Sequence, residues 1–248
     1  MDGRYQRMKR RRQEQILRRT IMVGIVGLIV LLMVFLINKM FFHKRIPVLD
    51  RAIGNIETSG ALTKVIEERP EFDVQLLTPN EYSRPGMATD SINGIVVHYT
   101  ANPGSTAQNN RDYFENLKDT HDTKASSHFV IGIEGEIIQC IPSNEVAYAS
   151  NQRNNDTISI EVCHPDETGK FTDATYESLV RLVAWLCGRF DLQIDDIIRH
   201  YDVTGKNCPK YYVEHEDAWE KLKEDVEIYI YTYGVDPSTI TEKSSVES

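Results

Sequence analysis

The stretch RHYDVTGKNCP, residues 199–209, carries the most specific chemical pattern in this chain. It places His200 eight positions before Cys208, with Lys206 two positions before the cysteine. A glycine and a proline lie in the same span, so we expect a loop here rather than a helix. Imidazole and thiolate are both zinc ligands, but most lone His and Cys pairs bind nothing, and a third ligand has to come from elsewhere.

The best candidate for that third ligand is His98, in the segment GIVVHYT at residues 94–100. The segment is apolar and rich in β-branched residues, which predicts a short buried strand that ends on the histidine. The ends of strands are common places for functional sites. His98 alone would more often be structural, so its role depends on the rest of the pattern.

Regular secondary structure is predicted from about residue 93 onward. Alternating or β-branched runs predict strands at 95–98 and 157–163, and a hairpin formed by 128–133 and 136–141. Helical spacing of apolar residues predicts helices at 105–118 with Ser105 as cap, at 173–190 with Thr172 or Asp173 as cap, and at 216–231. This mixture predicts an α/β fold with a central mixed β-sheet flanked by helices.

An uncharged apolar segment lies near the N-terminus. Residues 21–37 contain no charged side chain, and the segment reaches about 20 residues if it continues to Phe42, which is long enough to cross a bilayer. No small-residue cleavage site follows, which favours an uncleaved signal anchor over a signal peptide. Eight Lys and Arg residues precede it, so the N-terminus is expected in the cytoplasm and the rest outside the membrane. The alternative is a buried helix of a soluble protein.

The charge distribution argues against a nucleic-acid-binding protein, and the cysteine spacing argues against a CxxC motif. The formal net charge is −9 although residues 1–20 are basic, and an acidic body with a short basic segment beside an apolar run does not indicate nucleic-acid binding. The four cysteines show no CxxC spacing. Cys187 fits a buried helix position, whereas Cys140 and Cys163 lie in predicted strands and their pairing stays open.

Four segments together resemble one enzyme family. They are GIVVHYT (94–100), SSHFVI (126–131), ISIEVC (158–163) and RHYD…GKNCP (199–209). The combination resembles the zinc-dependent N-acetylmuramoyl-L-alanine amidases of the type-2 amidase family, which includes phage lysozyme-like amidases and is similar to the peptidoglycan recognition proteins. The resemblance covers roughly residues 80–225 and implies a central mixed sheet with a zinc ion in an open groove.

The resemblance also implies roles for individual residues. His98, His200 and Cys208 match the zinc ligands, and three protein ligands leave a fourth position for water, as in catalytic zinc sites. Lys206 matches the catalytic lysine, and Glu161 matches the catalytic glutamate of many bacterial and phage members.

Other members of the family use a tyrosine just before the second strand. Ser127 occupies that position here, which leaves Glu161 as the expected base. His128 is either a substrate contact or a hydrogen-bonded structural residue, and His164 and Glu145 are weaker candidates for substrate contacts.

The expected domain order follows from these assignments: a basic cytoplasmic segment (1–20), a transmembrane signal anchor (21–42), a connector (43–80) with a short helix at 62–68, a zinc amidase domain (81–233) and a disordered tail (234–248). The expected function is a membrane-anchored peptidoglycan amidase that cleaves the bond between N-acetylmuramic acid and L-alanine. The alternatives are a non-catalytic peptidoglycan-binding sensor on the same fold and a zinc hydrolase for another amide.

Overall fold

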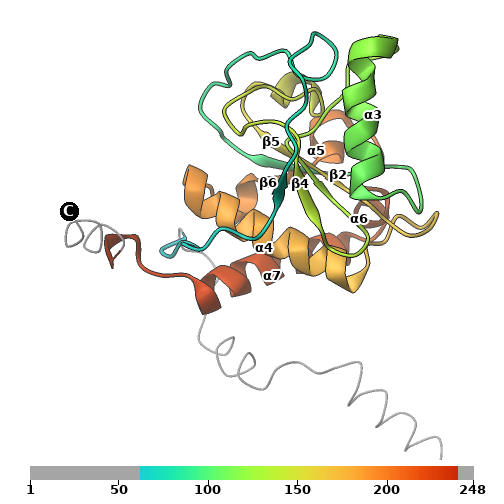
Figure 1. Ribbon diagram of the computed structural model, residues 1–248. Coiled ribbons are helices and arrows are strands. Elements are labelled where there is room, and N and C mark those ends of the chain that lie inside the picture. Colours follow the sequence, from blue (N-terminus) through green and yellow to red (C-terminus); the bar gives the residue numbers. More distant parts are fainter. Residues whose placement is uncertain (1–61, 240–248) are drawn as a thin grey trace, which may run out of the picture. The chain divides into compact units, whose positions relative to one another are not determined.

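The computed structural model describes residues 62–239, and in this part the strands form one mixed sheet (Figure 1). Their order across the sheet is β1-β4-β3-β5-β2-β6. The strands are β1 (Asp73–Val74), β2 (Ile95–Tyr99), β3 (Phe129–Ile131), β4 (Ile137–Gln139), β5 (Ile158–Val162) and β6 (Ile197–Arg199). β3 and β4 are antiparallel, and the other neighbouring pairs are parallel. The predicted mixed sheet is therefore confirmed.

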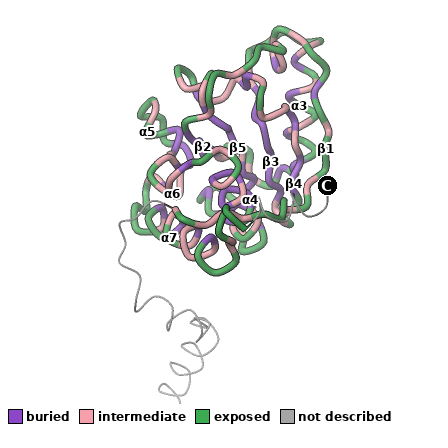
Figure 2. The backbone as a smooth tube through the Cα atoms, turned by 90° about the vertical axis from the view of Figure 1, so that its left-hand side faces the viewer, coloured by how far each residue is buried: buried purple, intermediate pink, exposed green. Residues whose placement is uncertain are grey.

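Helices cover both faces of the sheet (Figure 1). They are α3 (Ala107–Thr120), α4 (Asp173–Phe190), α5 (His200–Thr204), α6 (Lys210–Glu214) and α7 (Glu216–Tyr233), with 3-10 turns η1 (Asn151–Arg153) and η2 (Ile194–Asp196). β3 shows how the faces alternate, because Phe129 and Ile131 pack with α4 and α7 while Val130 packs with α3. Figure 2 shows the buried central strands between these layers.

The strand order brings distant segments together at one end of the sheet. β2 lies between β5 and β6 and runs parallel to both. In this register His98 is paired with Glu161, and Val97 is paired with Arg199. His200 follows Arg199 directly, so both histidines and the glutamate reach the carboxyl ends of three adjacent strands. Sites in parallel sheets are usually built at this edge.

The tip of the β3–β4 hairpin packs against α4. Gly135 has φ +86, and a Cβ atom there would lie 2.8 Å from the backbone oxygen of Ala174. The carbonyl oxygen of Gly135 accepts a hydrogen bond from Ser178 Oγ at 2.6 Å. Only glycine combines this backbone conformation with so close an approach.

Several local predictions differ from the structure. The span 199–209 is not all loop, because His200–Thr204 form α5, and the loop begins at Gly205 with φ +78. α3 is capped by Thr106, whose side chain accepts the backbone N–H of Asn109, rather than by Ser105. The predicted Thr172 cap of α4 is confirmed.

The segment before β1 is not helical, contrary to prediction. Val65 instead forms an antiparallel bridge with Val235, and Asp73–Val74 add the short edge strand β1. The Leu62 backbone N–H donates to Gln193 Oε1 and Lys64 Nζ donates to the Tyr231 carbonyl oxygen, contacts that a helix-propensity argument does not foresee.

The predicted transmembrane segment at 21–42 lies outside the described residues, as do the basic segment 1–20 and most of the tail. Among residues 62–239, no helix combines the length and the apolar character needed to span a bilayer.

The cysteines of the described chain are all free and buried. The Cys140 backbone N–H donates to the carbonyl oxygen of His128, just before β3, whereas Cys163 follows β5 on the other side of β3. No disulfide joins Cys140 and Cys163 in the structure.

Candidate active site

The structure brings together the three predicted ligands. His98 ends β2, and His200 opens α5 directly after the neighbouring strand β6. Cys208 returns to them through the loop after α5, which is closed by a 2.9 Å hydrogen bond from the Tyr201 backbone N–H to the Cys208 carbonyl oxygen. The short helix thus lets one segment supply two ligands.

The ligand atoms are close and shielded from solvent. The Nδ1 atoms of His98 and His200 are 3.1 Å apart, and Cys208 Sγ lies 3.9 Å from His98 Nδ1. The potential ligand atoms all lie within 4.8 Å of one another, and the residues are 1%, 6% and 2% exposed respectively. Two imidazole nitrogens and a sulfur therefore converge on one point.

This donor set fits zinc. Tetrahedral coordination with Zn–N of about 2.0–2.1 Å and Zn–S of about 2.3 Å places neighbouring ligand atoms about 3.3–3.6 Å apart. The observed 3.1 Å and 3.9 Å lie on either side of that range. Burial lowers the pKa of His98 well below its ordinary value, and His200 and Lys206 lower it further. A neutral imidazole is the form that binds a metal ion.

Two residues that the sequence analysis did not single out contact the outer nitrogens of the histidines. His98 Nε2 lies 3.2 Å from Ser150 Oγ, and His200 Nε2 lies 3.0 Å from Asn151 Oδ1. Ser150 immediately precedes the 3-10 turn η1, and Asn151 is its first residue. The weak sequence signal was the polar cluster SNQRNND at 150–156, which reads as an ordinary loop.

Glu161 lies beside His98 on β5, in direct register. The residue is partly exposed, but its Oε2 atom is buried and has no hydrogen-bond partner among the described residues. Burial raises the pKa of Glu161 to about 8, and the positive charge of Lys206 opposes this increase. A carboxyl group with such a pKa exchanges protons near neutrality, as a general acid or base must.

Lys206 lies in the exposed loop between α5 and Cys208. Its ammonium group is near enough to lower the pKa of His98, His200 and Glu161. It is thus a positive charge at the rim of the buried cluster.

His128 is a structural residue. Its Nδ1 accepts the backbone N–H of Ser159 at 3.0 Å, and its Nε2 donates to the Glu145 carbonyl oxygen at 2.9 Å. Glu145 itself forms an ion pair with Arg84. Ser127, at the position of the family's tyrosine, is buried and donates to the Phe129 carbonyl oxygen. These groups hold the sheet and its loops together.

Further buried polar atoms without partners lie just past the strand ends. Within the described chain these are Thr100 Oγ1, one residue after β2, and His164 Nε2, two residues after β5. His164 Nδ1 donates a hydrogen bond to the Asp166 carbonyl oxygen at 2.8 Å, and the His164 ring stacks on Tyr99. Because buried polar groups are normally paired, these atoms are candidates for contact with a ligand or water.

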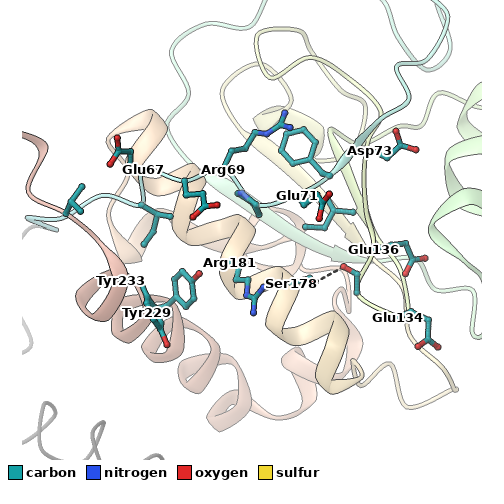
Figure 3. Close-up of a pocket in the computed structure, with 17 residues that line it drawn as sticks. Glu67, Arg69, Glu71, Asp73, Glu134, Glu136, Ser178, Arg181, Tyr229 and Tyr233 are labelled. Carbon is teal, nitrogen blue, oxygen red and sulfur yellow. Dashed lines mark hydrogen bonds between the residues drawn. The ribbon is translucent and has the colours of Figure 1, made fainter. Parts of the chain in front are cut away.

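A large hollow of about 1350 Å³ lies elsewhere (Figure 3). It is bordered by the segment 66–73, the hairpin tip, α4 and the end of α7, and acidic side chains such as Glu71 and Glu134 line it. None of the predicted ligands or catalytic residues is among its lining residues. The hollow is therefore separate from the histidine and cysteine cluster.

Comparison with known proteins identifies the family. The N-acetylmuramoyl-L-alanine amidase family model (Amidase_2) matches residues 88–211. The chain is 34% identical over 181 residues to the N-acetylmuramoyl-L-alanine amidase CwlL of Bacillus licheniformis, covering 68% of this chain and 50% of CwlL. It is 35% identical over 176 residues to BlyA of Bacillus subtilis (strain 168), covering 62% of this chain and 46% of BlyA. The chain thus spans about half the length of these relatives.

Solved structures agree. The catalytic domain of XlyA is 25% identical with a TM-score of 0.54, and the match covers 63% of this chain and 99% of that domain. PlyL shares the fold with a TM-score of 0.55 at 24% identity, covering 63% of this chain and 96% of PlyL. The matched residues include His98, Glu161 and His200 together with Cys208. On these grounds the chain belongs to the type-2 N-acetylmuramoyl-L-alanine amidase family.

Proposed function

We propose that this chain is a zinc-dependent amidase of the bacterial cell wall. It hydrolyses the amide between the lactyl group of N-acetylmuramic acid and L-alanine of the stem peptide. The single observation that carries the proposal is the convergence of His98, His200 and Cys208 within 4.8 Å, beside a carboxylate in register with His98. The family membership supports the choice of substrate.

The three ligands would hold a zinc ion with one position open for water. When bound, zinc brings the pKa of water to about 7 and polarises the carbonyl group of the substrate. His98 and Cys208 are buried, so their ligand atoms are screened from bulk solvent. Burial raises the pKa of the Cys208 thiol to about 12, so the thiolate needs a cation beside it.

Glu161 acts as the proton carrier. It takes a proton from the attacking water and delivers it to the nitrogen of the leaving L-alanine. Its buried Oε2 atom, free of other hydrogen bonds in the described chain, is available to accept that proton. Its buried environment favours the protonated carboxyl group, which helps Glu161 to hold the proton until the amine leaves.

Lys206 stabilises the negative charge that develops on the carbonyl oxygen. Its position at the rim of the cluster and its electrostatic effect on Glu161 support this role. Preorganised positive groups near a developing oxyanion commonly contribute about 10²–10³ in rate. Thr100 Oγ1 and His164 Nε2 are available for hydrogen bonds to the substrate.

The proposal includes a membrane anchor at 21–42, with the N-terminus in the cytoplasm and the catalytic domain outside. Its support is the uncharged apolar run from Ile21 to Ile37 and the excess of Lys and Arg before it. An extracytoplasmic domain would face peptidoglycan directly.

The test uses the full chain in mild detergent with purified peptidoglycan. Mass spectrometry is expected to detect free stem peptides that begin with L-alanine, lost on chelation and restored by zinc. The matched control is Cys208→Ser, which removes one ligand and is expected to give no product. Binding to muropeptides without cleavage by the zinc-loaded protein would instead favour the sensor. Products cut at another amide would change the substrate.

A further inference from the structure

We infer that Ser150 and Asn151 are positioning residues that orient the two histidines for zinc. The inference rests on the proposed zinc site and concerns residues next to the ligands. Each histidine directs Nδ1 toward the metal position, so its Nε2 atom points outward. Those outward atoms meet two consecutive residues of one loop, at 3.2 Å and 3.0 Å.

Asn151 determines which nitrogen of His200 carries the proton. The Oδ1 atom of an asparagine only accepts hydrogen bonds, so a bond to it requires a proton on His200 Nε2. A neutral imidazole has one N–H, which leaves Nδ1 with a free lone pair. That lone pair faces the other ligand atoms, as metal binding requires.

Ser150 has the corresponding role for His98. Its hydroxyl group accepts a hydrogen bond from Nε2–H and fixes the plane of the ring. Ser150 is 1% exposed, so water does not compete for this contact.

The loop that carries both residues is itself held firmly. Asn154 Oδ1 accepts the backbone N–H groups of Ala149 and Ser150, at 3.1 Å and 2.6 Å. Gln152 Nε2 donates to the Val203 carbonyl oxygen at 2.9 Å, which ties η1 to the helix that begins with His200. The acceptors and the ligand therefore move as one unit.

The backbone of Asn151 allows a variant that removes only its side chain. Asn151 has φ +53, a left-handed conformation that glycine adopts with less strain. The residue is exposed, so a glycine there would leave no cavity. Asn151→Gly thus removes the contact to His200 while it preserves the turn.

The experiment measures zinc affinity of the full chain in mild detergent by competition with a chromophoric chelator. Asn151→Gly and Ser150→Ala are each expected to weaken zinc binding about 10–100-fold. Asn151→Asp keeps an acceptor oxygen at this position and is expected to bind zinc at least as tightly as the parent chain. The matched control is Asp191→Gly, another exposed residue with positive φ (+54), which lies at the end of α4.

Cobalt substitution gives a second readout that a merely structural role would not change. The visible spectrum of the cobalt form reports ligand geometry, and we expect it to shift in Asn151→Gly but not in Asp191→Gly. The inference would be overturned if Asn151→Gly and Ser150→Ala bound zinc within twofold of the parent and the cobalt spectrum did not change. That result would leave the proposed function untouched.

The failure of the proposed function has a different signature. A parent chain that binds no zinc overturns the metal site and this inference with it. A parent chain that binds zinc but leaves peptidoglycan intact overturns the proposed reaction, while weakened zinc binding in the two variants would still support the positioning role.

Discussion

His98 and Glu161 stand opposite each other on the neighbouring parallel strands β2 and β5. In a parallel pair, residues at the same register project to the same face of the sheet. A candidate metal ligand and a carboxyl group are thus placed side by side by the pairing of the two strands. This arrangement does not depend on a flexible loop, so we expect the relative position of the two side chains to be rigid.

Glu161→Gln is expected to lower kcat by about 10²–10⁴ because the amide cannot carry the proton. The substitution keeps size and shape, so zinc content and thermal stability should stay near those of the parent. Product formation and metal content are measured on the same samples. Glu134→Gln, at the exposed tip of the hairpin, is the control. Full activity in Glu161→Gln would remove Glu161 from the mechanism.

Lys206→Met is expected to lower kcat by about 10²–10³, with little change in zinc content. The loss follows from removal of the positive charge at the rim of the cluster. Lys206→Arg should recover part of the rate. Lys221→Met serves as control because Lys221 pairs with Asp225 on α7 and lies outside the candidate site. Equal kcat in Lys206→Met and the control would contradict the role in charge stabilisation.

His128 predicts a specific loss of stability in acid. Burial lowers the pKa of His128 to about 4, whereas the unfolded residue titrates near about 6.5. Between about pH 6.5 and pH 4, His128 is protonated in the unfolded chain but stays neutral in the folded chain. The contribution is therefore complete above about pH 6.5 and is lost as pH falls toward about 4, to a total of about 3 kcal/mol.

Urea unfolding between pH 7.5 and 4 checks this prediction. His128→Gln is expected to flatten the pH dependence of the free energy of unfolding, whatever its own stability at pH 7.5. His215→Gln, at an exposed position, should keep the parent's pH dependence. An unchanged slope in His128→Gln would show that other groups cause the acid effect.

Gly135→Ala is expected to destabilise the fold by about 2–4 kcal/mol. The new methyl group combines the cost of a positive φ with a 2.8 Å approach to the Ala174 oxygen. Gly86→Ala separates the two effects, since Gly86 also has positive φ (+67) but nothing lies within 4 Å of its Cβ position. Its cost should be only about 1–2 kcal/mol, measured by chemical denaturation. Equal losses would mean that α4 moves to accommodate the methyl group.

Much of the fold could be predicted because side-chain periodicity and burial agree. In α4, Leu179, Leu182, Val183 and Leu186 follow helical spacing, and all are buried against the sheet. The grouping of His98, His200 and Cys208 was also foreseeable, since His98 ends a predicted strand and the other two share the stretch 199–209, a combination that resembles the family's zinc ligands.

The remaining features depend on contacts that a linear pattern does not record. The helical turn at His200–Thr204 is stabilised by Asp202, whose carboxylate accepts the backbone N–H of Arg199 at 2.8 Å. In the sequence, Asn151 looks like an ordinary loop asparagine, and only the folded structure shows its Oδ1 atom 3.0 Å from His200 Nε2. Roles of this kind follow from the sheet order, which sequence periodicity does not specify.

The long separation of the ligands along the chain has a consequence for biosynthesis. Cys208 lies 110 residues after His98, and β2 is enclosed only when β5 and β6 have joined its two edges. A nascent chain that ends before the cysteine lacks one of the three candidate ligands. On the proposed function, metal binding would close this long loop late in synthesis, and an incomplete chain would have no activity.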